Sequence, residues 1–146
     1  MEKWLRRVKK FFSLSFSDKM LLLNAFFVVA LIRLALKLLS FSRFKNAYAS
    51  VIATNDQMDV RDEAIKQTVW AIESVSHTLS AVCLPQALAL KYMLRKDKAT
   101  EIIIGVRKNG IFEAHAWVKK NGKILIGDSP ATNQQPLDFQ PLWTWQ

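Results

Sequence analysis

The chain has 146 residues, of which 51% are hydrophobic and 23% are charged, which excludes a disordered protein and one that lies wholly in lipid. One cysteine and two histidines cannot form an internal disulfide or a closed Cys/His zinc site, so we expect no metal or other cofactor and a reducing, cytoplasmic compartment. The formal net charge of +9 favours an anionic partner such as an acidic peptide, an anionic membrane face or nucleic acid.

The N-terminal region imitates a signal peptide or a membrane anchor, because basic residues precede an apolar stretch from Met20 to Leu39. These basic residues are Lys3, Arg6, Arg7, Lys9 and Lys10. Asn24, Arg33 and Lys37 interrupt the stretch, and no small-residue cleavage pattern follows it. We therefore expect a packed, soluble helix with a solvated basic face. Peripheral contact of this basic and apolar region with a membrane is the alternative.

Two helices are expected in this region. Ser17 or Asp18 can cap a helix that runs to Leu39, with its last basic residues near the negative end of the helix dipole. After a break, a weaker helix follows from Phe44 to Ala53.

The polar cluster from Thr54 to Gln57 marks the expected boundary of this region. It divides an N-terminal helical region, residues 1–57, from a core of residues 58–146. Apolar residues recur at helical spacing just after the boundary, which predicts an amphipathic helix over residues 60–79.

A further helix is expected to start beside Cys83. Pro85 suits a first helical turn, where its missing N–H is harmless, and the helix then continues to about Lys96. It is apolar nearly all round, so we expect the fold to enclose it. A thiol at a helix start lies near unpaired backbone N–H groups and the positive end of the dipole, both of which favour the thiolate.

The pattern then changes from helical to alternating. Three runs rich in Ile, Val, Phe and Trp are separated by Asn109-Gly110 and Asn121-Gly122: residues 101–107, 112–119 and 123–127. Asn-Gly between alternating runs is the strongest short signal of a β-hairpin, so a three-stranded antiparallel meander is expected. From Ser129 the polar tail with three prolines is expected to wrap the core. The fold class is therefore α+β.

The second turn fixes a register between His115 and Asp128. If Asn121-Gly122 is the loop, the pairing continued outward places these two residues opposite each other, with Cβ atoms about 4.5–5.5 Å apart. A carboxylate at that distance can set the tautomer and orientation of a catalytic base. With Cys83 as nucleophile, the three residues would form a catalytic triad.

Each of these residues also has a plainer interpretation. Cys83 could be a small buried hydrophobic residue, His115 an ordinary strand histidine, and Asp128 the cap of the turn at Ser129-Pro130. Trp117 lies on the His115 face by alternation, where it could contact substrate, although core packing is the favoured role. His77, at a helix end, is interpreted as structural.

Four segments carry a family resemblance, and they occur in this order: Cys83-Leu84-Pro85-Gln86-Ala87-Leu88-Ala89-Leu90, Ile104-Gly105-Val106-Arg107, Ala114-His115-Ala116-Trp117-Val118 and Gly127-Asp128. Together they resemble the transglutaminase-like B proteins of lasso-peptide biosynthesis, and similar proteins also carry an N-terminal segment of the type seen from Asp18 to Leu39. The resemblance implies N-terminal helices followed by a transglutaminase-like, papain-like core, with the catalytic helix packed on the meander.

The resemblance also implies an activity and its partners. It implies a cysteine peptidase that removes the leader from a ribosomally made precursor, with Cys83, His115 and Asp128 as nucleophile, base and orienting acid. A macrolactam-forming cyclase then acts on the new N-terminus. Fused relatives carry a leader-binding winged-helix module that nothing in this chain resembles, which implies a split form and a separate leader-binding protein. Gln86, where a basic residue is expected, and the tail after Asp128 depart from the family pattern.

Two other functions remain as alternatives. A transglutaminase-type acyl transferase uses the same triad and differs only in whether water or an amine resolves the thioester. A non-enzymatic, membrane-associated adaptor would keep the cleft as a vestige. Nucleic-acid binding is not expected, because the basic residues are dispersed along the chain and no recognised module accompanies them.

Overall fold

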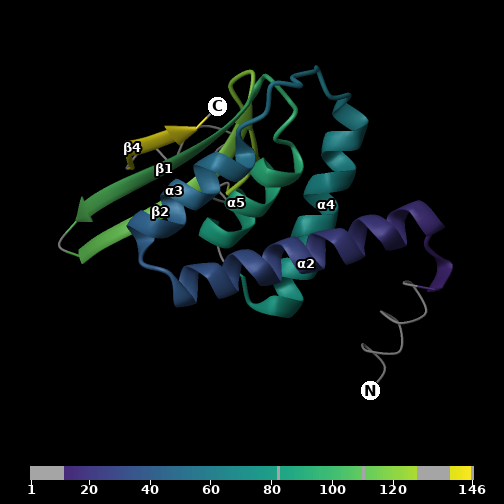
Figure 1. Ribbon diagram of the computed structural model, residues 1–146, viewed down its shortest axis with the longest axis horizontal. Helices are drawn as coiled ribbons and strands as arrows, with labels where there is room; N and C mark the ends of the chain where they lie inside the picture. Colours follow the sequence, from purple (N-terminus) through teal and green to yellow (C-terminus); the bar gives the residue numbers. More distant parts are fainter. Residues whose placement is uncertain (1–11, 82, 110, 128–138, 146) are drawn as a thin grey trace.

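The protein has an α+β fold in which helices cover one side of an antiparallel sheet (Figure 1). The computed structural model describes residues 12–81, 83–109, 111–127 and 139–145. Within these residues, four helices precede four strands, and the strands form one sheet in the order β3-β2-β1-β4. The helices-then-strands order and the antiparallel meander confirm the predicted fold class.

Helix α2, Phe16–Leu38, begins after the N-cap residue Ser15. The backbone N–H of Asp18 donates to the Ser15 hydroxyl at 3.1 Å, and that hydroxyl donates to the Asp18 carboxylate at 2.7 Å. The predicted caps, Ser17 and Asp18, are therefore wrong by two or three residues. α2 buries a narrow face: Ala25, Val28, Val29 and Ile32.

The other helices are α3 (Phe41–Ile52), α4 (Asp62–Leu79) and α5 (Cys83–Met93). α5 is the centre of the fold, since it contacts the other three helices and strands β1, β2 and β3. Its residues 87–90 are completely buried, which confirms that this apolar helix is enclosed. The Tyr48 hydroxyl of α3 donates to its Leu88 carbonyl at 2.7 Å, and burial raises the pKa of Tyr48.

The sheet contains β1 (Thr100–Asn109), β2 (Ile111–Lys120), β3 (Lys123–Ile126) and β4 (Gln140–Trp145). The first three strands are the predicted meander. β4 is a correction, because the tail was expected only to wrap the core and instead pairs with β1 as an edge strand. Pro141 is tolerated on this edge, where a shift in register also occurs between Ile104 and Gly105.

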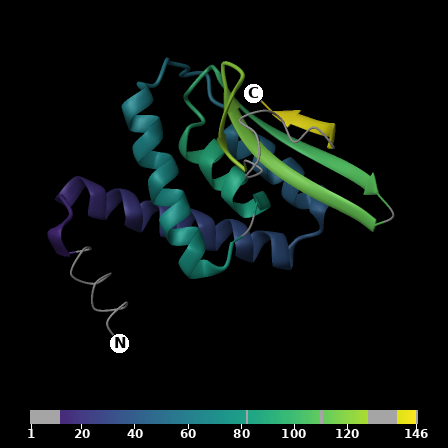
Figure 2. The ribbon, with the colours of Figure 1, turned by 180° about the vertical axis from the view of Figure 1, so that it is seen from behind.

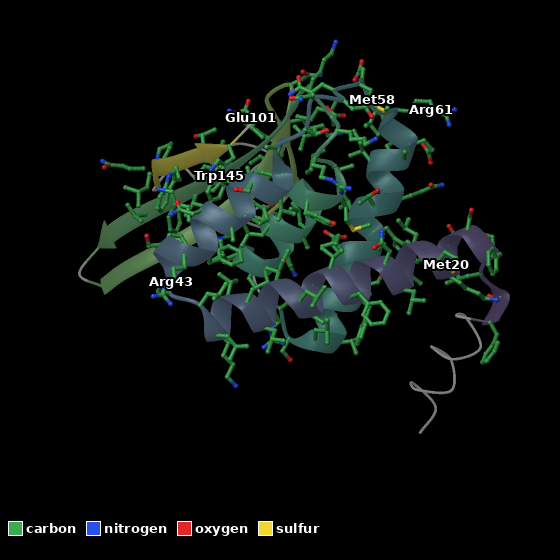
Figure 3. The ribbon with its side chains drawn as sticks, in the orientation of Figure 1. Met20, Arg43, Met58, Arg61, Glu101 and Trp145 are labelled. Carbon is green, nitrogen blue, oxygen red and sulfur yellow. The ribbon has the colours of Figure 1, made fainter. Side chains whose placement is uncertain are left out.

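The aromatic residues of β4 join the sheet to the helical layer. Trp143 lies 5.3 Å from Phe41 of α3, and Trp145 lies 5.4 Å from Tyr48, measured between ring centroids. Lys45 lies 3.7 Å from the centroid of Trp143. Figure 3 shows Trp145 beside α3, and Figure 2 shows the sheet from the other side. The tail thus does cover the core, but as a strand.

A buried ion-pair cluster connects the segment before α4 to the α5–β1 connection and to β2. Asp97 is 2% exposed, and its carboxylate accepts from Lys120 Nζ at 2.8 Å. It also accepts from the backbone N–H of Val60 at 3.2 Å and of Ala99 at 2.8 Å. Lys120 donates in addition to Asp59 at 2.9 Å. The sequence pattern gave no sign that Lys120 is buried.

Candidate active site

The first residue of α5 is Cys83, and its side chain is half-buried. The thiol is hydrogen-bonded to the side chain of His115, and it accepts from the backbone N–H groups of Ala116 and Leu84. The hydrogen bond with His115 is the largest cause of a lowered thiol pKa; burial opposes it, and the two N–H groups add to it. The sulfur therefore lies where a thiolate is stabilised.

His115, in strand β2, is held between this thiol and a backbone carbonyl. Its Nε2 lies 2.7 Å from the carbonyl oxygen of Gly127. Because a carbonyl oxygen only accepts, Nε2 carries a proton, and Nδ1 is left for the sulfur. The hydrogen bond with Cys83 raises the pKa of His115, burial opposes this, and the Gly127 carbonyl adds to it. The pair is thus biased toward thiolate and imidazolium.

The uniform register predicted for the second hairpin is wrong beyond Lys119. Lys120 pairs with Lys123 as expected, but Val118 pairs with Ile126, so a bulge adds one residue to β3. The bulge shifts the following residues and places the Gly127 carbonyl against the His115 ring. Asp128, the predicted orienting acid, lies outside the described residues, and its role stays a prediction.

Trp117 lies on the same face of β2 as His115 and is completely buried. It packs in a small cluster with Ile103, Ile124 and Phe139. Its ring is stacked on that of His115, with centroids 6.2 Å apart and planes at 26°. The burial agrees with the core-packing interpretation, and the stacking helps to hold the imidazole in place. Contact of Trp117 with substrate stays a prediction.

Cys83, His115 and Gly127 open on a cleft of about 680 Å³. Another part of its lining comes from α4 and the C-cap residue that follows it. These residues were not singled out as site residues by the sequence: Glu73, Ser76, His77 and Ser80. Gln86 also lines the cleft and donates to the Ala81 carbonyl at 3.0 Å. The spacing of Glu73 and His77, one helical turn apart, was the signal for a shared face of α4.

The described residues contain no group of three or more His, Cys, Asp or Glu side chains that could hold a metal ion. The chemistry available among them is that of a thiolate beside an imidazolium at a helix start. Such a pair attacks carbonyl carbons and then carries an acyl group as a thioester.

Gly127 is expected to tolerate no side chain. Its φ is +84°, and a Cβ would collide with the Ala116 carbonyl oxygen and lie 2.8 Å from Trp117 Cα. We expect Gly127→Ala to cost about 2–4 kcal/mol of unfolding free energy, measured by urea denaturation, and to slow alkylation of Cys83. Gly122→Ala is the matched control, because Gly122 has a similar φ of +81° but open space around it. Equal losses in both variants would show that the contact with β2 is unimportant.

Comparison with known proteins identifies the family. The family model of the transglutaminase-like superfamily matches residues 28–144, which is most of the chain. Searches of curated proteins and of solved structures found no match. The superfamily includes cysteine peptidases, in agreement with the cysteine and histidine that the fold brings together. On this match, the chain belongs to the transglutaminase-like superfamily.

Proposed function

We propose that the protein is a cysteine peptidase that removes the leader from a ribosomally synthesised lasso-peptide precursor. Cys83 acts as nucleophile, His115 as base and Asp128 as orienting acid. The observation that supports the proposal most directly is the hydrogen bond between Cys83 and His115 at the start of α5, beside an open cleft. The four sequence segments that resemble lasso-peptide B proteins support the choice of substrate.

The chemistry proceeds through a thioester. The Cys83 thiolate attacks the carbonyl carbon of the last leader residue, and the oxyanion is stabilised by backbone N–H groups at the start of α5. The His115 imidazolium then gives its proton to the leaving amine as the C–N bond breaks, which frees the N-terminus of the core peptide. His115 next takes a proton from water, which attacks the thioester and releases the leader as a carboxylate.

The size of the cleft supports a peptide substrate. Its volume of about 680 Å³ lies in the range of about 300–1,000 Å³ that is typical of clefts enclosing drug-sized ligands, which is enough for a short peptide segment.

The proposal includes two partner proteins and a cellular compartment. A separate protein binds the leader and presents the precursor, and a macrolactam-forming cyclase uses the amine that the cleavage frees. The precursor is made in the cytoplasm, so the peptidase acts there. Asp128 follows Gly127 directly in the sequence, and the contact of the Gly127 carbonyl with His115 supports the proposed role of Asp128 as orienting acid.

Leader cleavage by wild-type protein and by Cys83→Ala tests the proposal. Each is mixed with a candidate precursor and its leader-binding protein, and the products are identified by mass spectrometry. We expect wild-type protein to release a leader with a free carboxylate, and Cys83→Ala to lose about 10³-fold or more of the rate.

Two outcomes would contradict the proposal. Equal release by both proteins would remove Cys83 from the mechanism. A leader joined to an amine, instead of a free leader, would show a transglutaminase-type acyl transferase. If no precursor is processed and Cys83 is inert to thiol reagents, the non-enzymatic adaptor is favoured.

A further inference from the structure

The basic charge of the chain is concentrated in its N-terminal part. Residues 1–55 contain ten Lys and Arg residues against two acidic residues, whereas residues 56–146 contain eleven against ten. The first 55 residues therefore carry +8 of the net charge of +9. In the described part of this region, residues 12–55, the acidic residue is Asp18, and its carboxylate accepts a hydrogen bond from Ser15. The charge thus marks the helical end of the protein and leaves the catalytic part nearly neutral.

An apolar row runs along α2 on the side away from the core. We call it the outer stripe: Phe16, Met20, Leu23, Phe27, Leu31, Leu34 and Leu38. Each of these side chains is between 49% and 79% exposed. Their average spacing of about 3.7 residues is close to the 3.6 of an α-helix, so the row stays nearly straight along the helix. A soluble monomer rarely exposes such a continuous apolar surface without a partner for it.

The fold leaves this stripe uncovered by the described residues. α2 lies in front of α4 and α5 in Figure 1 and behind α4 in Figure 2, so it is an outer element of the helical layer. Figure 3 labels Met20 toward its N-terminal end. Cations lie beside the stripe: by helical geometry Lys19 and Lys37 are displaced by about 80° around the axis, and Arg33 by about 120° on the same side. A long basic side chain at such a position can reach a lipid phosphate while its stem stays on apolar surface.

The packing of α2 favours a helix that lies on a bilayer over one that crosses it. By length and composition α2 is able to span a membrane, and only 17% of its most apolar window is buried in the protein. Its inner face, however, is packed in the core, where Ala25 and Val29 are 0% exposed. To cross a bilayer, α2 would have to leave α4 and α5 and expose their apolar faces. Arg33 would then also enter the hydrocarbon region.

We propose that α2 docks the protein on an anionic membrane surface. The outer stripe enters the boundary between headgroups and acyl chains, and the basic residues around it bind anionic headgroups. The charge distribution favours a membrane as the partner of the outer stripe, since an anionic bilayer complements both the apolar stripe and the surplus of cations. The docking goes beyond the proposed peptidase activity and does not depend on it.

Sedimentation of the full-length protein with lipid vesicles tests the docking. We expect wild-type protein to pellet with mixed phosphatidylcholine–phosphatidylglycerol vesicles and to bind pure phosphatidylcholine vesicles much more weakly. The double variant Phe27→Glu/Leu31→Glu is expected to lose about tenfold or more of its partition coefficient. Phe27→Ser/Leu31→Ser, which leaves the charge unchanged, is expected to lose binding as well. Equal melting temperatures will show that both variants fold.

Lys123→Glu is the matched control for charge. It changes the net charge as much as the double glutamate variant does, but Lys123 is the exposed first residue of β3, next to the turn that follows β2. We expect it to bind vesicles nearly as wild-type protein does.

Four outcomes would overturn the docking. Wild-type protein could fail to pellet with the mixed vesicles, or the stripe variants could pellet as it does. A wild-type dimer that the stripe variants dissociate would show that a second copy covers the stripe. Resistance of vesicle-bound protein to alkaline carbonate would show a helix that spans the bilayer. None of these results bears on cleavage by Cys83, so the two proposals fail separately.

Discussion

The His115→Ala variant is expected to react with iodoacetamide at neutral pH about tenfold or more slowly than wild-type protein. The hydrogen bond with His115 is the largest cause of the lowered pKa of Cys83, and burial alone would raise that pKa. Without the imidazole, less of the sulfur is thiolate at neutral pH. Cleavage of a precursor should fall further, by about 10³-fold, because the proton donor to the leaving amine is also lost.

The pH dependence of alkylation shows in which direction His115 shifts the pKa of the Cys83 thiol. In wild-type protein the rate should rise with pH through an apparent pKa below the ordinary thiol value of 9.0, and in His115→Ala this midpoint should move up. The pKa of His115 is raised above its ordinary value of 6.5, so the imidazolium keeps its proton up to a higher pH. Peptidase activity should therefore fall at low pH as the thiolate is protonated, and at high pH as the imidazolium loses its proton. Both midpoints belong to the pair.

His77→Ala is the matched control for this prediction. His77 lines the same cleft, but the hydrogen bonds that lower the thiol pKa come from His115, Ala116 and Leu84. Its alkylation profile should match that of wild-type protein. An unchanged profile in His115→Ala would show that the imidazole does not stabilise the thiolate.

Removal of the Asp97 carboxylate is expected to be the most destabilising of the substitutions considered. Asp97→Ala should cost about 3–5 kcal/mol of unfolding free energy, because it leaves Lys120 buried with a weaker set of partners. The substitution also removes the acceptor of the Val60 and Ala99 N–H groups. Urea denaturation at neutral pH measures the loss.

The stabilisation by Asp97 should disappear in acid. Burial alone would raise the pKa of Asp97, but the hydrogen bond from Lys120, with the backbone N–H of Ala99 and Val60, outweighs burial and lowers it below 3.8. A carboxyl group with a lowered folded-state pKa stabilises above its unfolded pKa and loses this effect as pH falls through the folded value. The difference between wild-type protein and Asp97→Ala should therefore be constant near neutrality and shrink below about pH 4.

Asp56→Ala is the control for burial, because it removes a carboxylate whose ion pair is exposed. Asp56 pairs with Lys96 at 2.6 Å, but both side chains are largely exposed, at 67% and 49%. An exposed pair contributes less than about 1 kcal/mol. If Asp97→Ala were no more destabilising than Asp56→Ala, the buried cluster would not be important for stability.

Local patterns in the sequence were sufficient to predict α4, α5 and the first three strands. The helix start at Cys83 depends on Pro85, and the second hairpin depends on its Asn-Gly turn, where Asn121 has a φ of +50°. β4 was missed because it contains Pro141 and pairs with a strand more than thirty residues away. The burial of Lys120 was missed for a similar reason, since Asp59 and Asp97 reach it from distant parts of the chain.

The candidate site was predictable in its two central residues and not in its surroundings. A helix start places the Cys83 sulfur, and strand alternation places the His115 ring, so both follow from local rules. The bulge that brings the Gly127 carbonyl to that ring depends on packing against Ala116 and Trp117, which no local pattern specifies. The contribution of α4 to the cleft depends on how two helices cross, which is likewise a property of the assembled core.

The central position of α5 limits which substitutions the protein can accept during evolution. The proposed nucleophile, Cys83, is the first residue of the helix that contacts nearly every other described element, so repacking at a distant position such as Ile72 or Val118 would displace the sulfur relative to the imidazole. Exposed residues of α4 that line the cleft can therefore change without disturbing the core. Residues packed around α5 must preserve both the fold and the position of Cys83 relative to His115.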